Sequence, residues 1–175
     1  SLHTDEGVYE SYDRTMECAL IKRAKLDEVT AWLVGSGEMT FSTEPDKVYR
    51  VTIANKISIA QMMRVFQKFQ VILDTQPFKY SVNAAGDALE LTAPTTIRNS
   101  GTAYSEPLIT VYGSGNITLS INGNSYPLRN VQESITIDSE MMEVFKGNAN
   151  QIGKNEIRWT GHVSKIKIQP RWRWL

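Results

Sequence analysis

From residue 83 onward the sequence consists of short segments in which apolar and polar residues alternate. Glycine, asparagine, serine or proline separates most of these segments, which read LELT, LITVYG, NITLSING, SITID, EIRWTG and VSKIKIQP. Side chains on a β-strand point alternately to opposite faces, so each segment has one apolar and one polar face. Short strands with turn residues between them are typical of a sandwich or barrel. The pattern therefore predicts a β-sandwich over residues 85–170 or so.

The clearest turn signal in this part is the Asn122-Gly123 pair within LSINGNSYPL. A type I′ hairpin turn needs positive φ at both central residues, which asparagine and glycine adopt readily. We expect a hairpin tip at this pair. Gly113 and Gly115 predict another turn, between the segments LITVYG and NITLSING.

The first part of the chain mixes element types. RTMECALIK (14–22) places Met16, Cys18 and Leu20 on one side, which predicts a strand. KLDEVTAWLVGSG then changes to a helical period, with its apolar residues on one face and Gly35 as the stop. A short amphipathic helix is marginal alone. We therefore expect two of its apolar residues to pack it against the strands around Val65 and Phe69; these two are Trp32 and Leu33.

Two extended runs follow the helix. In MTFSTEPDKVYRVTI, the Glu-Pro-Asp-Lys segment predicts a turn, because Pro45 presets the φ angle that a turn requires. RVFQKFQVILDTQPFKY (64–80) predicts a strand that ends near Pro77. The change of character near residue 82 predicts two domains. Residues 1–82 are expected to be mainly β, with α+β character because of the helix, and residues 83–175 to form the sandwich.

Residues 165–175, KIKIQPRWRWL, combine basic and aromatic side chains as some nucleic-acid-binding segments do. Alternation on a strand sorts them differently: Ile166, Ile168, Pro170, Trp172 and Trp174 share one face, and Lys165, Lys167, Gln169, Arg171 and Arg173 share the other. An apolar face and a solvated cationic face are typical of a half-buried strand. We interpret the segment as such a strand, with an edge or bend at Pro170.

Charge and cysteine content narrow the function classes. Nineteen lysine and arginine residues balance nineteen aspartate and glutamate residues. A nucleic-acid-binding domain usually carries a basic excess, so we expect no nucleic-acid partner. Cys18 is the one cysteine, which leaves no intramolecular disulfide or cysteine metal site and favours an intracellular context or an assembly built inside a cell. No stretch approaches the ~18 apolar residues that span a membrane, and we expect no membrane partner.

Residues that could carry catalysis are sparse. His3 and His162 are isolated from each other, and Cys18 alternates with apolar residues as a buried, inert thiol does. The acids of DSEMMEV (138–144) lack the density of an oxygen-ligand loop. GSGN (113–116) has no helix after it to complete a phosphate cradle. We therefore predict no catalytic, cofactor or metal site.

Carbohydrate binding is an alternative function. Exposed aromatic side chains on a β-sandwich can stack on sugar rings, although packing is the commoner role of such residues. The aromatic residues in the right part of the chain for sugar or protein contact are Tyr104, Tyr112, Tyr126 and Trp159. A module of this kind would help attachment to a host surface.

An ordered series of segments resembles the distal tail proteins of long, non-contractile-tailed bacteriophages or prophages. NSGTAYSEPLITVYGSGNITLSINGNSYPLRNV, ITIDSE and GKNEIRWTGHVSKIKIQPRWR resemble the second half of that family. LDEVTAWLVGSG, STEPDKVY and PFKY resemble the end of its first domain. The resemblance covers roughly residues 12–174 in the family's order, and no single motif is diagnostic alone.

The resemblance implies a structural tail-tip protein without enzymatic activity or cofactor. Residues 1–82 would be the C-terminal portion of a belt domain that forms a six-membered ring, and residues 83–175 a galectin-like β-sandwich. The protein would be a hub between the tail tube and the baseplate or tail fibres, in a virion assembled in the cytoplasm of the bacterial host. Its implied partners are further copies of itself, the tail tube protein, the tape-measure protein, and the tail-associated lysin, tail-fibre or receptor-binding proteins.

The family's opening strands, which should precede SLHTDEG, are not among these 175 residues. We expect the natural protein to begin earlier and its ring to depend on those strands. The 175-residue form is expected to be monomeric or to associate irregularly through the sheet edge that the missing strands would leave unpaired.

Overall fold

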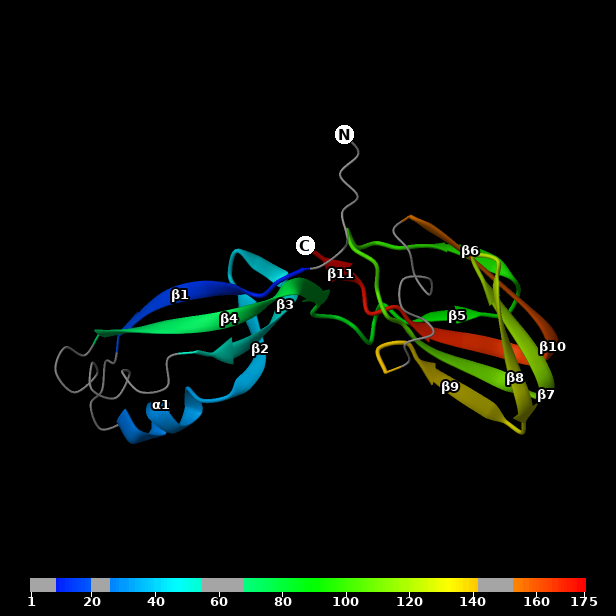
Figure 1. Ribbon diagram of the computed structural model, residues 1–175, viewed down its shortest axis with the longest axis horizontal. Helices are drawn as coiled ribbons and strands as arrows, with labels where there is room; N and C mark the ends of the chain where they lie inside the picture. Colours follow the sequence, from blue (N-terminus) through cyan, green and yellow to red (C-terminus); the bar gives the residue numbers. More distant parts are fainter. Residues whose placement is uncertain (1–8, 20–25, 55–67, 142–152) are drawn as a thin grey trace. The chain divides into compact units, whose positions relative to one another are not determined.

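The computed structural model describes residues 9–19, 26–54, 68–141 and 153–175 (Figure 1). The chain divides into two compact units, Ser1–Lys79 and Tyr80–Leu175. Each unit has its own hydrophobic core, and strands dominate both. The expected mainly β fold with one short helix in its first part is confirmed.

The first unit is built around an antiparallel sheet with the strand order β1-β4-β3-β2. Its elements are β1 (Tyr12–Ala19), α1 (Leu26–Trp32), β2 (Ser36–Phe41), β3 (Glu44–Ile53) and β4 (Lys68–Ser81). Alternate residues of β3 and β4 are buried, as a sheet with one covered face requires. Met16 and Cys18 of β1 pack on this core, so the strand expected in residues 14–22 is confirmed as far as Ala19. Leu20 and Val65 lie outside the described residues.

Strand β4 continues through Pro77 to Ser81, so the expected end near Pro77 is wrong. The pairing of β1 with β4 reaches only from Ala19 to Tyr12, which lies opposite Thr75. Pro77 lies beyond the last residue that β1 pairs. The missing N–H of proline therefore breaks no hydrogen bond to β1, and the strand can continue.

The turn expected around Pro45 is also misplaced. The β2–β3 turn lies at Ser42 and Thr43, and Pro45 belongs to β3. Opposite residues pair as Phe41 with Glu44, and the register shifts between that pair and the next, so Pro45 lies in an irregular part of the ladder. A proline is tolerated at such a bulge because the ladder there does not need its N–H.

Helix α1 covers the sheet through a narrower stripe than the sequence suggested. Val29 is half-buried and Leu33, one turn later, is buried, whereas the side chain of Trp32 is 74% exposed. A helix of two turns presents one narrow apolar stripe, and residues four apart occupy it. The expected packing of Leu33 is confirmed and that of Trp32 is wrong. Gly35 follows the helix with a φ of 81°, as expected of its stop.

The second unit contains one branched antiparallel sheet. Four strands follow the order β5-β10-β7-β8, while β6 also pairs with β10 and β9 also pairs with β7. The strands of this sheet are β5 (Leu89–Leu91), β6 (Thr95–Arg98), β7 (Leu108–Ile121), β8 (Asn124–Val131), β9 (Ser134–Asp138) and β10 (Lys154–Gln169). The two-residue β11 (Arg173–Trp174) follows β10 and is not part of this sheet.

Two long strands, β7 and β10, form the centre of this sheet (Figure 1). LITVYG and the first six residues of NITLSING belong to the single strand β7, and EIRWTG and VSKIKIQ belong to β10, so the turn expected at Gly113 and Gly115 is wrong. The β7–β10 register shifts on either side of His162, which marks a bulged bend. A Cβ on Gly113 would clash with the carbonyl oxygen of His162, and one on Gly161 would lie 2.6 Å from that of Asn116. Glycine therefore permits the bend rather than ending the strand.

The bend gives each long strand two halves with different neighbours. Residues 108–112 of β7 pair with β9 and residues 115–121 with β8. Residues 154–157 of β10 pair with β6 and residues 166–168 with β5. Apolar residues from both halves form one buried cluster, as the predicted sandwich requires. The cluster contains Leu91, Ile109, Val111, Ile117, Leu119, Ile121, Leu128, Val131, Ile137, Ile157, Ile166 and Ile168.

The expected hairpin at Asn122-Gly123 is confirmed. Ile121 of β7 lies opposite Asn124 of β8, which leaves two residues in the loop. Their φ angles are 51° and 84°, the positive values that a type I′ turn requires. Asn122 also donates from Nδ2 to Oδ1 of Asn155 at 2.9 Å and accepts from the backbone N–H of Glu156 at 2.8 Å. The turn is thereby attached to β10.

Replacing Gly123 with valine is expected to destabilise the second unit by about 1–3 kcal/mol, because a β-branched residue is strained at positive φ. Thermal unfolding monitored by circular dichroism would measure the loss. Ser125→Val, at an exposed position of β8, is the matched control and should unfold near the wild-type temperature. Wild-type stability in Gly123→Val would contradict the turn assignment.

Trp32→Ala is expected to change the free energy of unfolding by less than about 0.5 kcal/mol, because the indole is largely exposed. Leu33→Ala should cost about 2–5 kcal/mol, since this side chain is buried in the core of the first unit. Denaturant titration of both variants would test the contrast. A larger loss in the tryptophan variant would show that the indole packs in solution.

Candidate functional site

The four aromatic residues proposed for sugar or protein contact lie in different surroundings. Tyr126 and Trp159 both lie opposite Leu119 in the sheet and pack against the buried cluster. Burial raises the pKa of the Tyr126 hydroxyl. Tyr112 alternates with buried neighbours on β7, so its ring is on the outer face, where the Lys165 ammonium lies 5.3 Å from its centroid. Tyr104 precedes β7, and the four side chains share no common surface.

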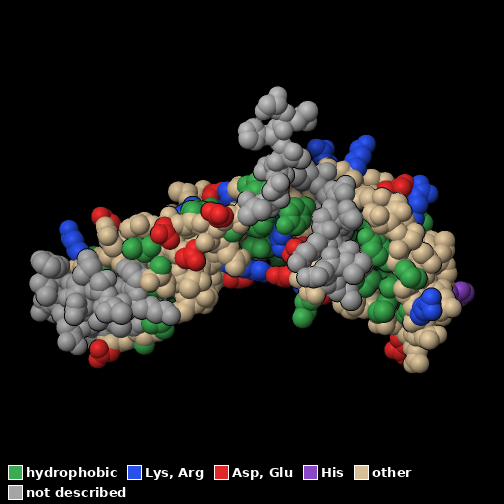
Figure 2. All heavy atoms as spheres, viewed as in Figure 1, with side chains coloured by type: hydrophobic (Ala, Val, Ile, Leu, Met, Phe, Trp, Pro, Cys, Tyr) green, Lys and Arg blue, Asp and Glu red, His purple; other side chains and the backbone are tan. Residues whose placement is uncertain are grey.

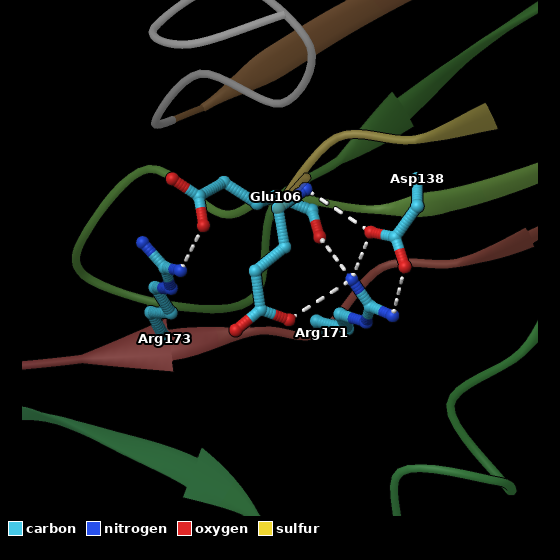
Figure 3. A network of polar contacts seen from close by, with 5 residues as sticks. Glu106, Asp138, Arg171 and Arg173 are labelled. Atoms are coloured by element: carbon cyan, nitrogen blue, oxygen red, sulfur yellow. Dashed lines mark hydrogen bonds and ion pairs between the residues drawn. The ribbon is translucent and has the colours of Figure 1, made fainter. Parts of the chain in front are cut away.

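A network of charged side chains gathers instead around the end of the chain (Figure 3). Arg171 adopts a φ of 49° just after β10 and turns its guanidinium toward Asp138. Nη1 and Nη2 of Arg171 donate to the two carboxylate oxygens of Asp138 at 2.6 and 3.0 Å. Nη1 also lies 3.2 Å from a carboxylate oxygen of Glu140. The two-pronged arginine–carboxylate geometry is the strong form of an ion pair.

Arg173 is the more buried of the two arginines, with 7% of its surface exposed. It forms an ion pair with Glu106, and its guanidinium carbon lies 5.5 Å from the ring centroid of Tyr104 and 5.8 Å from that of Tyr80. Its carbonyl oxygen accepts hydrogen bonds from the backbone N–H groups of Thr102 and Ala103. Side chain and backbone together fasten the end of the chain to residues 102–106.

These contacts correct the sequence interpretation of residues 165–175. The half-buried strand is confirmed through Gln169, but Arg171 and Arg173 do not lie on a solvated face. The alternation fails because Pro170 ends the strand and the positive φ of Arg171 reorients the residues that follow. In the sequence, the signal for this reorientation is Pro170, which predicts a bend but not its direction.

The ion pair between Arg171 and Asp138 affects both pKa values. The hydrogen bonds from Arg171 lower the pKa of the Asp138 carboxyl, and this effect exceeds the rise that burial causes. The same hydrogen bonds raise the pKa of Arg171. Since an arginine engages each of these carboxylates, the network is suited to holding chain segments together.

The first unit has a smaller cluster of the same character. The guanidinium carbon of Arg14 lies 4.3 Å from the ring centroid of Phe41 and 4.7 Å from that of Tyr49, within cation–π range. The Tyr49 hydroxyl donates to Glu44, which also accepts from Lys79 at 3.0 Å. The bond from Tyr49, and then that from Lys79, lowers the pKa of Glu44. The cluster ties β1, β2, β3 and β4 together.

Other residues considered for chemistry stand apart. His162 is exposed on β10, and Cys18 is half-buried with its thiol pKa raised by burial. Within residues 9–19, 26–54, 68–141 and 153–175, no group of three or more histidine, cysteine, aspartate or glutamate side chains could hold a metal ion. Acidic and basic side chains are interspersed over the described surface that faces the viewer in Figure 2.

The helix in the described part of the chain is too short and too polar to cross a membrane.

The fold is similar to that of the Dit protein (gp 19.1) of phage SPP1, described as a paradigm of the hub adsorption apparatus in phages that infect Gram-positive bacteria. The TM-score is 0.57 at 14% sequence identity, and the match covers 94% of this chain and 79% of that one. Hydroxypropylphosphonic acid epoxidase from S. wedmorenis matches 76% of this chain and 54% of its own at a TM-score of 0.21 and 10% identity, which is too weak for any argument. No protein-family model and no curated protein matches the chain. At this identity the similarity to Dit establishes the fold.

Removing the Asp138 carboxylate should make the free energy of unfolding less sensitive to acid. Because its pKa is lowered in the folded protein, its contribution is complete above the unfolded-state pKa of about 3.9 and is lost as pH falls through the folded-state value. Asp138→Asn should unfold at a lower temperature near neutral pH and lose less stability than the wild type on acidification. Calorimetry across this pH range measures both.

Asp87→Asn, in a turn of the same unit, serves as the control and should keep the wild-type acid dependence. If Asp138→Asn and the wild type lost equal stability between neutral and acidic pH, the ion pair would not stabilise the fold in solution.

Proposed function

We propose that this chain is a structural component of a phage tail tip, a hub that connects the tail tube to baseplate or tail-fibre proteins. The observation that carries the proposal is the fold similarity to the SPP1 hub protein, which extends over 94% of the chain and both of its units. The ordered sequence segments between residues 12 and 174 point to the same class of protein independently of the coordinates.

In this proposal residues 1–82 are the C-terminal portion of a ring-forming belt domain and residues 83–175 a galectin-like sandwich. The helix-covered sheet of the first unit and the bent sheet of the second support the assignment. The work of such a protein is done by its surfaces and requires no cofactor or catalytic group. The proposed location is the tip of the virion tail, after assembly in the host cytoplasm.

The proposed assembly is a homo-hexameric ring. Among the described strands, β1 and β2 are the edges of the first sheet, each with one neighbour. Unpaired strand edges readily pair with another chain, and head-to-tail contacts between copies close into a ring when the rotation permits. The remaining proposed partners are the tail tube, tape-measure, lysin, fibre and receptor-binding proteins that adjoin a tail-tip hub.

Light scattering and negative-stain electron microscopy of the full protein that the gene encodes would test this function. The expected result is a closed ring with six-fold symmetry and a mass of six protomers. Where the gene encodes residues before Ser1, the 175 residues alone, measured at the same concentrations, provide the comparison and should be monomeric or irregularly associated. A natural protein that stays monomeric at high concentration and forms no rings would overturn the proposal.

A further inference from the structure

A shallow groove of about 170 Å³ crosses the outer face of β7 and β10 in the second unit. Its lining residues alternate along the two strands with buried core residues such as Val111 and Ile168, so they project away from the core. Leu108 lies opposite Gln169, and Thr110 lies opposite Lys167. The complete lining is Leu108, Thr110, Tyr112, Lys167 and Gln169. We call it the Tyr112–Lys167 groove.

Apart from the Thr110 hydroxyl, which lies 3.1 Å from that of Thr136, the groove presents polar groups that the described residues do not use. Lys167 is exposed and forms no ion pair with any described residue. Its neighbour across the sheet, Glu90, instead binds Lys165 at 3.0 Å. Within the described part of the chain, neither the side-chain amide of Gln169 nor the hydroxyl of Tyr112 has a hydrogen-bond partner. Hydrogen-bond donors and acceptors are therefore available to a ligand.

The charges around the groove leave an excess of positive charge. Lys165 and Glu90 compensate each other, and Asp138, which lies opposite Leu108 on β9, is held by Arg171. With respect to the described residues, Lys167 remains as the uncompensated charge that lines the groove. An anionic group is the natural complement of a free ammonium beside neutral hydroxyl and amide groups.

We propose that the Tyr112–Lys167 groove binds an acidic saccharide residue, with Lys167 contacting the sugar carboxylate. Thr110, Gln169 and the Tyr112 hydroxyl would bond the ring hydroxyls, while Leu108 and the Tyr112 ring contact its apolar C–H surface. Pockets for drug-sized ligands have volumes of about 300–1,000 Å³. The groove, at about 170 Å³, is smaller than these, and its size fits one sugar ring. Of the four aromatic residues selected from the sequence, this site uses Tyr112 alone.

Titration of the ¹⁵N-labelled chain with trigalacturonate, followed by NMR, tests the proposal. Binding should shift the backbone amides of residues 108–112 and 165–169 together. Lys167→Gln should weaken the affinity about tenfold, as expected when a charge-assisted hydrogen bond is lost. The methyl-esterified trisaccharide, which has the same rings without the charge, should bind as weakly to the wild type as trigalacturonate binds to that variant.

The matched control is Lys154→Gln, which removes an exposed lysine at the other end of β10 and should leave the affinity unchanged. Three results would overturn the proposal: no shifts with millimolar trigalacturonate, equal losses in the two lysine variants, or equal affinity for the charged and esterified sugars. Equal losses would indicate nonspecific charge attraction, and equal affinities would show that the carboxylate is not recognised.

Discussion

The second unit depends on the close backbone approach of β7 and β10 at their common bend. Gly113 lies against the carbonyl group of His162, and Gly161, with a φ of 99°, lies against that of Asn116. No side chain fits at these contacts, and the register shifts beside them let both strands change direction together. One pair of strands can therefore support β9 and β5 on one half and β8 and β6 on the other. The single core of this unit follows from that bend.

The sequence predicts those parts of the fold whose cause is local. Alternation is a property of one strand, so β1, β4, β9 and the Asn122-Gly123 hairpin could be found without knowledge of their neighbours. A glycine in a strand, by contrast, is compatible with a turn or with a bend, and the partner strand decides between them. The same holds for Pro45, which a bulge accommodates within β3. Likewise, the sheet beneath the helix decides whether Trp32 or Leu33 is buried.

The interaction sites were harder to foresee because they join distant segments. Arg171 and Arg173 meet Asp138 and Glu106 only after the chain turns at Pro170, and no spacing rule connects these positions. The Tyr112–Lys167 groove likewise exists only in the register of β7 with β10. The resemblance to distal tail proteins indicated the fold, yet it carried no information about which side chains remain free on its surface.

The central position of β10 also has a consequence for folding during synthesis. The strands β1, β2, β3 and β4 of the first unit's sheet all leave the ribosome before β5 is made, so that sheet can form early. The second sheet lacks its middle strand until residues 154–169 have been made, and pairings between segments distant in sequence form slowly. During that interval the apolar face of β7 is exposed to misassociation. The hairpin with β8 forms in about 1–10 μs and pairs one edge of β7 while β10 is still being translated.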